Sequence, residues 1–158
     1  MLKLRRFWTA FWPLLVLYVL ILLFFWRVLT PDIADRMRFA AGDFSYIFYP
    51  ARYFVADSLW QGQLPVWNTH VANGYPHCAD PQAACFYPVS LVTALLSRGH
   101  LTMEMLQGEA IFHFALAATF TYLFVLYLLR NRKAAFVSAL VFTFSGYLCS
   151  RAIENPGT

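Results

Sequence analysis

The sequence predicts an all-α, polytopic membrane protein with three transmembrane helices and one large external loop that carries short interfacial helices. Composition, three long apolar runs and the placement of basic residues support this fold class. Of the 158 residues, 60% are hydrophobic and only 13% are charged. Soluble proteins carry about 25% charged residues, so this chain has too few charges to cover a water-exposed surface. The composition therefore places the chain in the membrane class.

Three apolar runs are long enough to cross a bilayer. Residues 7–26 contain no charge, and we expect the first transmembrane helix over 7–30. The other two helices are expected over 109–129 and 134–150. A 20-residue helix is about 30 Å long, which matches the apolar core of a bilayer. The first run exceeds the roughly 7–15 apolar residues of a signal peptide, so we expect an uncleaved anchor.

The basic residues predict the orientation. Acidic residues are absent from the N-terminal stretch 1–6 and from the turn 130–133, whereas the loop 31–108 mixes both signs. The basic residues of the first two stretches are Lys3, Arg5, Arg6, Arg130, Arg132 and Lys133. By the positive-inside rule, 1–6 and 130–133 are cytoplasmic, and 31–108 and 151–158 are external. The net charge of +4 thus reflects topology. The sequence lacks the basic polar face that binding of a nucleic acid would need, so we expect no nucleic-acid partner.

The external loop predicts two short helices that lie along the membrane surface, near 51–61 and 89–97. Pro50 and Pro88 suit the first turn of a helix, and Gly62 and Gly99 suit the stop. Both segments have a one-sided apolar pattern. Many aromatic side chains favour contact with the membrane–water interface and with lipids. Residues 63–76 contain two prolines and an Asn-Gly pair, which predict a packed irregular loop with turns.

The loop motifs also resemble a known family. The order is GD, YP, a helix, G-x-LP-x-WN, G-x-P and FYP before an amphipathic helix. The matching residues are Gly42, Asp43, Tyr49, Pro50, Gly62, Leu64, Pro65, Trp67, Asn68, Gly74, Pro76, Phe86, Tyr87 and Pro88. This order resembles the first external loop of the bacterial YfhO membrane-protein family, and residues 130–148 resemble its second cytoplasmic turn and third span. Family members are several times longer, so we expect an N-terminal fragment that lacks C-terminal helices or needs a partner chain.

The resemblance implies a partial GT-C-like fold in the bacterial inner membrane. Such enzymes transfer a sugar from a polyprenyl-phosphate donor to a cell-envelope acceptor on the outer face. By this analogy Asp43 is the catalytic residue. Its position about a dozen residues past the first span places it near the headgroups, where a carboxylate can act as a base or hold a divalent metal. The alternative is a helix N-cap, and metal dependence stays open.

Five further loop residues are candidates for substrate binding. Arg52 suits a phosphate, because guanidinium pairs with it bidentately. Trp67 and Tyr75 offer apolar faces to a sugar ring, and Asn68 and His70 offer hydrogen bonds. All of them could equally pack the loop or contact lipid.

Other site types are disfavoured by the spacing of residues. His70, His77, Cys78, Asp80 and Cys85 do not have the spacing of a zinc site, so we expect no metal centre of that kind. Cys78 and Cys85 would face an oxidising compartment, where both a disulfide and free thiols are open to them. No nucleotide loop or hydrolase elbow is present in the sequence.

The alternative function is a non-enzymatic polytopic membrane protein for transport, lipid handling or assembly. A transporter should carry polar residues near the middle of its spans. The predicted spans have almost no such residues, and this favours the enzyme hypothesis. His113 and Thr119 lie in the second span, but His113 is only four residues past Glu109, which suits packing at the interface. We expect the 158-residue fragment alone to be inactive, because the other walls of the cavity would be missing.

Overall fold

The computed structural model describes the backbone of residues 2–39 and 42–153 and the side chains of residues 12–39 and 42–150. Over these residues the chain is mostly helical and contains no strand, which confirms the all-α prediction. The described chain divides into two compact units. Unit 1 comprises residues 2–37 and 110–153, and unit 2 comprises residues 38–39 and 42–109. We describe each unit by itself.

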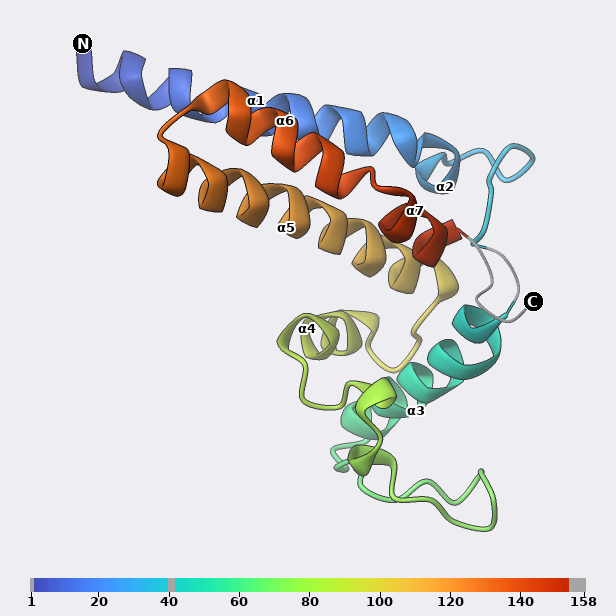
Figure 1. Ribbon diagram of the computed structural model, residues 1–158. Coiled ribbons are helices and arrows are strands. Elements are labelled where there is room, and N and C mark those ends of the chain that lie inside the picture. The colour runs from blue at the N-terminus through green and yellow to red at the C-terminus, as the bar shows by residue number, and fades with distance from the viewer. Residues whose placement is uncertain (1, 40–41, 154–158) are drawn as a thin grey trace. The chain divides into compact units, whose positions relative to one another are not determined.

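Unit 1 is a group of packed helices (Figure 1). Its elements are α1 (Leu2–Phe24), α2 (Trp26–Leu29), most of α5 (Met103–Leu129), α6 (Arg132–Thr143) and α7 (Gly146–Ile153). Helix α1 packs against α6. It also contacts α5, through a 2.7 Å hydrogen bond between the Tyr18 and Thr119 hydroxyls. Phe25, between α1 and α2, makes an edge-to-face contact with Phe114 of α5. Thr119, in the predicted second span, therefore has a structural partner.

Two segments of the described chain are long and apolar enough to cross a membrane. They are Met103–Leu129, with a mean hydropathy of 1.8, and Arg132–Ser150, with 1.3. They cover the predicted spans 109–129 and 134–150, although the second bends between α6 and α7. The side chains of residues 7–11, in the first predicted span, lie outside the described residues. The part of that span with described side chains includes the shorter apolar helix Trp12–Phe24. A third transmembrane helix therefore stays a prediction.

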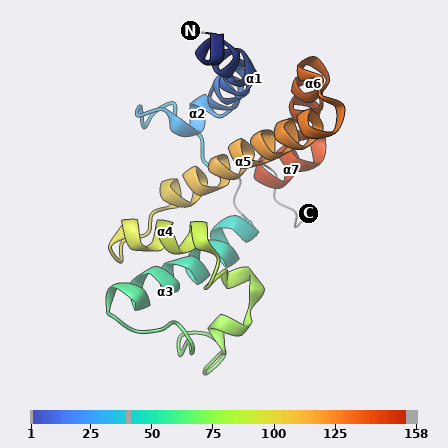
Figure 2. The same cartoon turned by 90° about the vertical axis from the view of Figure 1, so that its left-hand side faces the viewer.

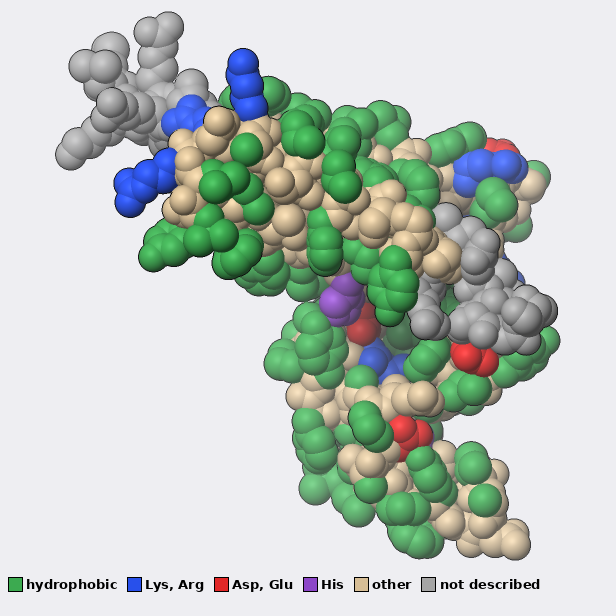
Figure 3. All heavy atoms as spheres, in the orientation of Figure 1, with side chains coloured by type: hydrophobic (Ala, Val, Ile, Leu, Met, Phe, Trp, Pro, Cys, Tyr) green, Lys and Arg blue, Asp and Glu red, His purple; other side chains and the backbone are tan. Residues whose placement is uncertain are grey.

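The helices of unit 1 bury both small and large side chains, and they also expose many large apolar ones. Leu17 and Tyr122 are among the large side chains that are buried. Ala118, Ala135, Ala139 and Thr143 are fully buried. Large apolar side chains face outward, and Figure 3 shows the hydrophobic surface over these helices; they include Phe120, Phe124, Tyr127, Leu128, Val137 and Val141. Small residues let helices approach closely when surrounding lipid provides no hydrophobic drive for association. This arrangement is typical of helices that contact lipid.

Unit 2 is built around α3 (Tyr49–Trp60), which packs against α4 (Pro88–Ser97), as Figure 2 also shows. These are the two helices predicted near 51–61 and 89–97. A π-helical turn, η1 (Phe44–Phe48), leads into α3. Two short 3-10 turns, η2 (His77–Ala79) and η3 (Pro81–Ala83), precede α4. The helices' position on a membrane surface stays a prediction.

Helix α3 holds unit 2 together through two neighbouring faces. Val55 packs against Ala83 and Cys85 on the η2–η3 side. Ala56 packs against Ala94 and Leu101 on the α4 side. Because adjacent residues of one helix contact different partners, α3 links the irregular segment to α4.

The segment predicted as a packed irregular loop is closed by a single antiparallel bridge. Asn68 and Tyr75 exchange backbone hydrogen bonds of 2.8 and 2.9 Å. The turn between them ends at Gly74, with φ +124°, where a Cβ atom would lie 2.7 Å from Nε1 of Trp67. Only glycine fits this position, because both the backbone angle and the indole exclude a side chain.

Candidate functional site

Unit 2 contains a cavity of about 820 Å³, bordered by η1, by α3 and by the segment 68–80. This volume lies within the roughly 300–1,000 Å³ of small-molecule sites. The lining residues are Tyr46, Ile47, Tyr49, Pro50, Ala51, Tyr53, Phe54, Asp57, Asn68, His70, Val71, Tyr75, His77 and Asp80. Tyr and Phe rings therefore form much of the wall, and a few polar groups stand among them.

The two carboxylates of the cavity differ in how far they are already hydrogen-bonded. Asp80 accepts a 2.6 Å bond from the Tyr75 hydroxyl on Oδ2 and a 2.8 Å bond from the Gln82 N–H on Oδ1. The bond from Tyr75, and then that from Gln82, lowers the pKa of Asp80. Asp57 accepts one side-chain bond, from Gln61 to Oδ2 at 2.8 Å. Asp80 is thus held as an anion by the fold, whereas Asp57 keeps more capacity for a ligand.

Two histidines stand on the same wall. His77 is only 3% exposed, and its Nε2 lies 3.0 Å from the Ala51 carbonyl. That carbonyl requires a proton on Nε2, so Nδ1 is a buried acceptor without a partner among the described residues. His70 is exposed, and its backbone N–H donates to Oδ1 of Asn68 at 2.9 Å. The ring of Phe54 makes edge-to-face contacts with both imidazoles.

Of the five predicted substrate-binding residues, three meet at this cavity. Asn68, His70 and Tyr75 line it. Trp67 does not line it; its indole covers Gly74 and is 56% exposed. The geometry brings the three side chains within reach of one ligand, and their role in binding stays a prediction.

Arg52 is placed in a buried ion pair. Its Nη2 donates to both carboxylate oxygens of Glu109 at 2.6 and 2.7 Å, and the two side chains are 10% and 7% exposed. Ser90 donates to the same carboxylate at 3.0 Å. The cluster joins α3, α4 and the start of α5. Arg52 could bind a phosphate only if this pair opened.

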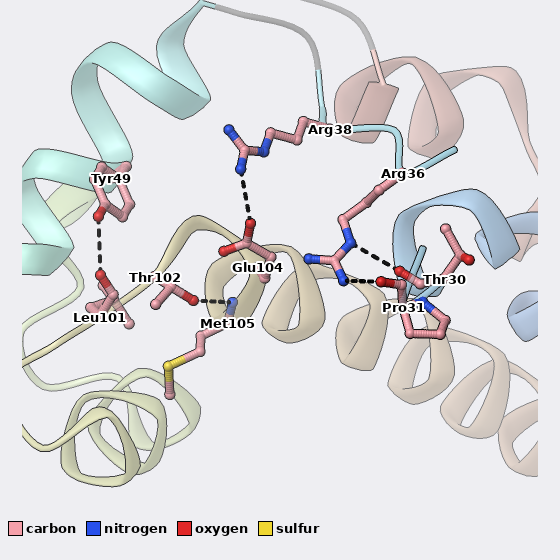
Figure 4. Close-up of polar contacts among 9 residues, drawn as sticks. All are labelled: Thr30, Pro31, Arg36, Arg38, Tyr49, Leu101, Thr102, Glu104 and Met105. Carbon is pink, nitrogen blue, oxygen red and sulfur yellow. Dashed lines mark hydrogen bonds and ion pairs between the residues drawn. The ribbon is translucent and has the colours of Figure 1, made fainter. Parts of the chain in front are cut away.

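Other basic residues near Asp43 in sequence also have partners, as Figure 4 shows. In unit 1, Arg36 donates to the carbonyls of Thr30 and Pro31 at 2.9 and 3.3 Å. In unit 2, Arg38 lies 3.2 Å from Glu104, and its side chain is 68% exposed. An exposed pair of this kind is held weakly, so Arg38 stays available to an anion.

Asp43 is half-buried and directly precedes η1. Its backbone is helical, with φ −54° and ψ −35°, and its side chain makes no capping hydrogen bond. Asp43 therefore does not cap the helix through its side chain, which was the alternative to a catalytic role. Asp43 is not among the residues that line the cavity, although Tyr46 and Ile47 of the same turn are. Its catalytic role stays a prediction.

Cys78 and Cys85 are free thiols that pack in one cluster with Val55 and Ala83. The Cys78 thiol donates to the Pro65 carbonyl at 3.1 Å, and the Cys85 thiol donates to the His77 carbonyl at 3.9 Å. Burial, and then the neighbouring Cys78 thiol, raises the pKa of Cys85 to about 12. No group of three His, Cys, Asp or Glu side chains suited to a metal occurs among the described residues.

Sequence reasoning did not single out the α3 side of the cavity. Pro50, Tyr53, Phe54 and Asp57 have the i, i+3, i+4, i+7 spacing of one helical face. The one-sided apolar pattern predicted for this helix excludes Asp57, which was not considered as a ligand group. The pattern could have indicated a ligand wall with one carboxylate.

Comparison of the chain with models of known protein families, with curated proteins and with solved structures finds no match. The resemblance to the YfhO family therefore stays a hypothesis drawn from the loop motifs.

Proposed function

We propose that this chain is part of a membrane glycosyltransferase-like protein, and that the cavity of unit 2 holds the sugar. The observation that supports the proposal is the combination of aromatic walls with an amide, an imidazole and carboxylates in one cavity of about 820 Å³. A sugar ring offers C–H faces that pack on aromatic rings and hydroxyl groups that pair with polar side chains. A mostly apolar pocket with a few placed polar groups is the usual form of a small-molecule site.

The polar residues of the cavity have separate roles in this proposal. The side chains of Asn68 and His70 contact sugar hydroxyls, and Asp57 accepts a hydrogen bond from another. Among the described residues, no Lys or Arg lines the cavity. The phosphate of a polyprenyl-linked donor therefore lies outside it, next to the headgroups, while the sugar enters.

Asp43 is the proposed catalytic base, on the turn whose next residues line the cavity. Its carboxylate accepts no hydrogen bond among the described residues, so it is available to an acceptor hydroxyl. A positioned base contributes roughly 10²–10⁴ in rate. A divalent metal at this carboxylate is the other form of the proposal, with the metal screening the leaving phosphate.

The membrane setting of the proposal is a bacterial inner membrane with the N-terminus in the cytoplasm and unit 2 outside. Two helices long and apolar enough to span support it, as do the basic stretches 1–6 and 130–133. A third span and the partial GT-C-like fold belong to the same proposal. Further helices or a partner chain would complete the site.

A non-enzymatic membrane protein that binds a sugar or lipid headgroup is the second candidate. The observation that favours it is that Asp43 does not line the cavity. In that case unit 2 binds its ligand without transferring it.

The experiment is sugar transfer in membranes that contain the product of the complete reading frame. The donor is a radiolabelled polyprenyl-phosphate sugar, and Asp43→Asn is compared with Asp35→Asn, whose carboxylate forms a surface ion pair with Arg27. We expect Asp43→Asn to lower transfer by about 10²–10⁴-fold and Asp35→Asn to leave it unchanged. Wild-type transfer by Asp43→Asn would refute the catalytic assignment. Absence of transfer in the wild type, with sugar binding retained, would favour the second candidate.

A further inference from the structure

The two cysteines of unit 2 belong to one packed cluster. Cys78 lies in η2 and Cys85 follows η3, so two short turns bring residues seven apart into one apolar cluster. Cys85 is 5% exposed, and Cys78 is half-buried. The other side chains of the cluster are apolar and carry no group that competes for either sulfur; they are Ala51, Val55, Leu59 and Ala83.

The polar partners of the two thiols are weak ones. Each donates to a backbone carbonyl, Cys78 to Pro65 and Cys85 to His77. Thiols are weak donors, so breaking these two bonds costs little. Cys78 packs against the cluster that contains Cys85, so the two thiols share one apolar environment.

We propose that Cys78 and Cys85 form an intramolecular disulfide by exchange with a small disulfide or with the oxidised, disulfide form of a dithiol oxidoreductase. Cys78, the more accessible thiol, loses its proton and attacks one sulfur of the oxidant. A mixed disulfide forms and the first thiolate leaves. Cys85 then loses its proton and attacks the sulfur of Cys78, which releases the second thiolate. The oxidant is reduced to two thiols, and these take up the two protons.

The bond would close the ring 78–85, which contains Asp80, and His77 directly precedes this ring. Both residues line the cavity, so the bridge would fix one wall of the site. By reducing the freedom of the unfolded chain, closure of a ring of this size should raise Tm by about 5–15 °C. The inference does not depend on the identity of the cavity's ligand.

The test counts thiols in the purified full chain with and without oxidised glutathione. After denaturation, a maleimide labels the remaining thiols, and mass spectrometry counts them. The reduced chain has three cysteines, and we expect oxidation to leave one, Cys149. Cys149→Ala should lose both remaining labels. Cys85→Ala should accumulate a glutathione adduct on Cys78, because no second thiol resolves it.

Three results would overturn the proposal. One is that wild type keeps all three labels or stops as stable glutathione adducts. Another is that bridging joins Cys149 or a second chain, as seen on a non-reducing gel. The third is that the folded chain forms the bridge no faster than the chain in denaturant. The Tm of the double variant Cys78→Ala/Cys85→Ala should not respond to the oxidant, which separates the bridge from other oxidation.

Discussion

The two units differ in the polar side chains that they bury. Among the described residues, unit 1 buries apolar side chains such as Leu17 and Tyr122 and one polar side chain, Thr143, and it exposes large apolar groups such as Phe124, which is 63% exposed. Unit 2 buries an arginine–glutamate pair, Asn68 and His77. The difference shows that two parts of one short chain have different interiors, one mainly apolar and one with buried polar groups. The exposed apolar surface of unit 1 suits contact with lipid, whereas unit 2 contains polar side chains that can form hydrogen bonds with a ligand.

The two units also differ in how far their ion pairs are exposed to water. The pair of Arg27 with Asp35 in unit 1 is 47% and 39% exposed at its two side chains. The pair of Arg52 with Glu109 in unit 2 is almost closed to water and has Ser90 as a third member. Water screens the first pair and leaves the second strongly coupled, so equal substitutions should have unequal effects.

The largest expected effect is loss of one partner of the buried pair. Arg52→Ala removes the guanidinium that is held by the buried Glu109 carboxylate, and should lower the free energy of unfolding by about 3–5 kcal/mol. The matched change Arg27→Ala removes an exposed pair and should cost at most about 1 kcal/mol. Thermal unfolding in detergent measures both. Equal losses would contradict the contrast in burial between the units.

A second test enlarges a small side chain at the centre of unit 1. Ala139 is fully buried, so Ala139→Leu should overpack the helices and cost about 1–3 kcal/mol. Val141 is 64% exposed two residues later, and Val141→Leu should change stability little. Unfolding of the two variants in the same detergent measures the difference. If Ala139→Leu is as stable as wild type, the helices are not packed at that residue.

Two glycines of unit 2 offer a smaller comparison. Gly74→Ala places a methyl group against the Trp67 indole at a φ of +124°, and should cost about 1–3 kcal/mol. Gly108→Ala lies in α5 with no atom within 4 Å of the added carbon. It should stabilise the chain by up to about 1 kcal/mol through better helix propensity. Opposite signs in thermal unfolding are the expected result, and equal signs would refute it.

The smallest expected effect concerns the acid side of the stability profile. The bond from Tyr75 is the largest cause that lowers the pKa of Asp80 in the folded chain. A lowered folded-state pKa adds stability above the unfolded pKa, which is lost as pH falls through the folded value. Tyr75→Phe should therefore raise the pKa of Asp80 toward the ordinary value of an aspartate and weaken this acid dependence. A carbon-13 NMR titration of the Asp80 carboxyl measures the shift, and an unchanged pKa would contradict it.

Much of the local structure followed from short-range chemistry. Pro50 and Pro88 start α3 and α4, and Gly62 and Gly99 follow their ends, as the sequence predicted. The predicted span 109–129 lies within α5, which begins six residues earlier, at Met103. Glu109 lies within the helix and is paired with Arg52. The length of the apolar run therefore predicts the span and not the extra turns that precede it.

The site was harder to predict than the helices. Arg52 and Glu109 are 57 residues apart, and local spacing gives no reason to pair them. Asp57, His70 and Asp80 meet at the cavity because α3 and two tight turns fold together, which is a tertiary effect. The residues chosen for their chemistry, Asn68, His70 and Tyr75, do line the cavity, and whether they bind a ligand stays a prediction.

Sugar binding to the full chain tests the central claim most directly. Saturation-transfer NMR with glucose, galactose, mannose and N-acetylglucosamine, on the chain in lipid nanodiscs, should show saturable binding of at least one. Tyr46→Ala and His70→Ala change residues that line the cavity, and each should weaken that binding about tenfold or more. Phe86→Ala is the matched control, because Phe86 is 73% exposed and Tyr46 is 75% exposed, but only Tyr46 lines the cavity. No saturable binding by any of these sugars, or binding that Tyr46→Ala and His70→Ala leave unchanged, would contradict the account.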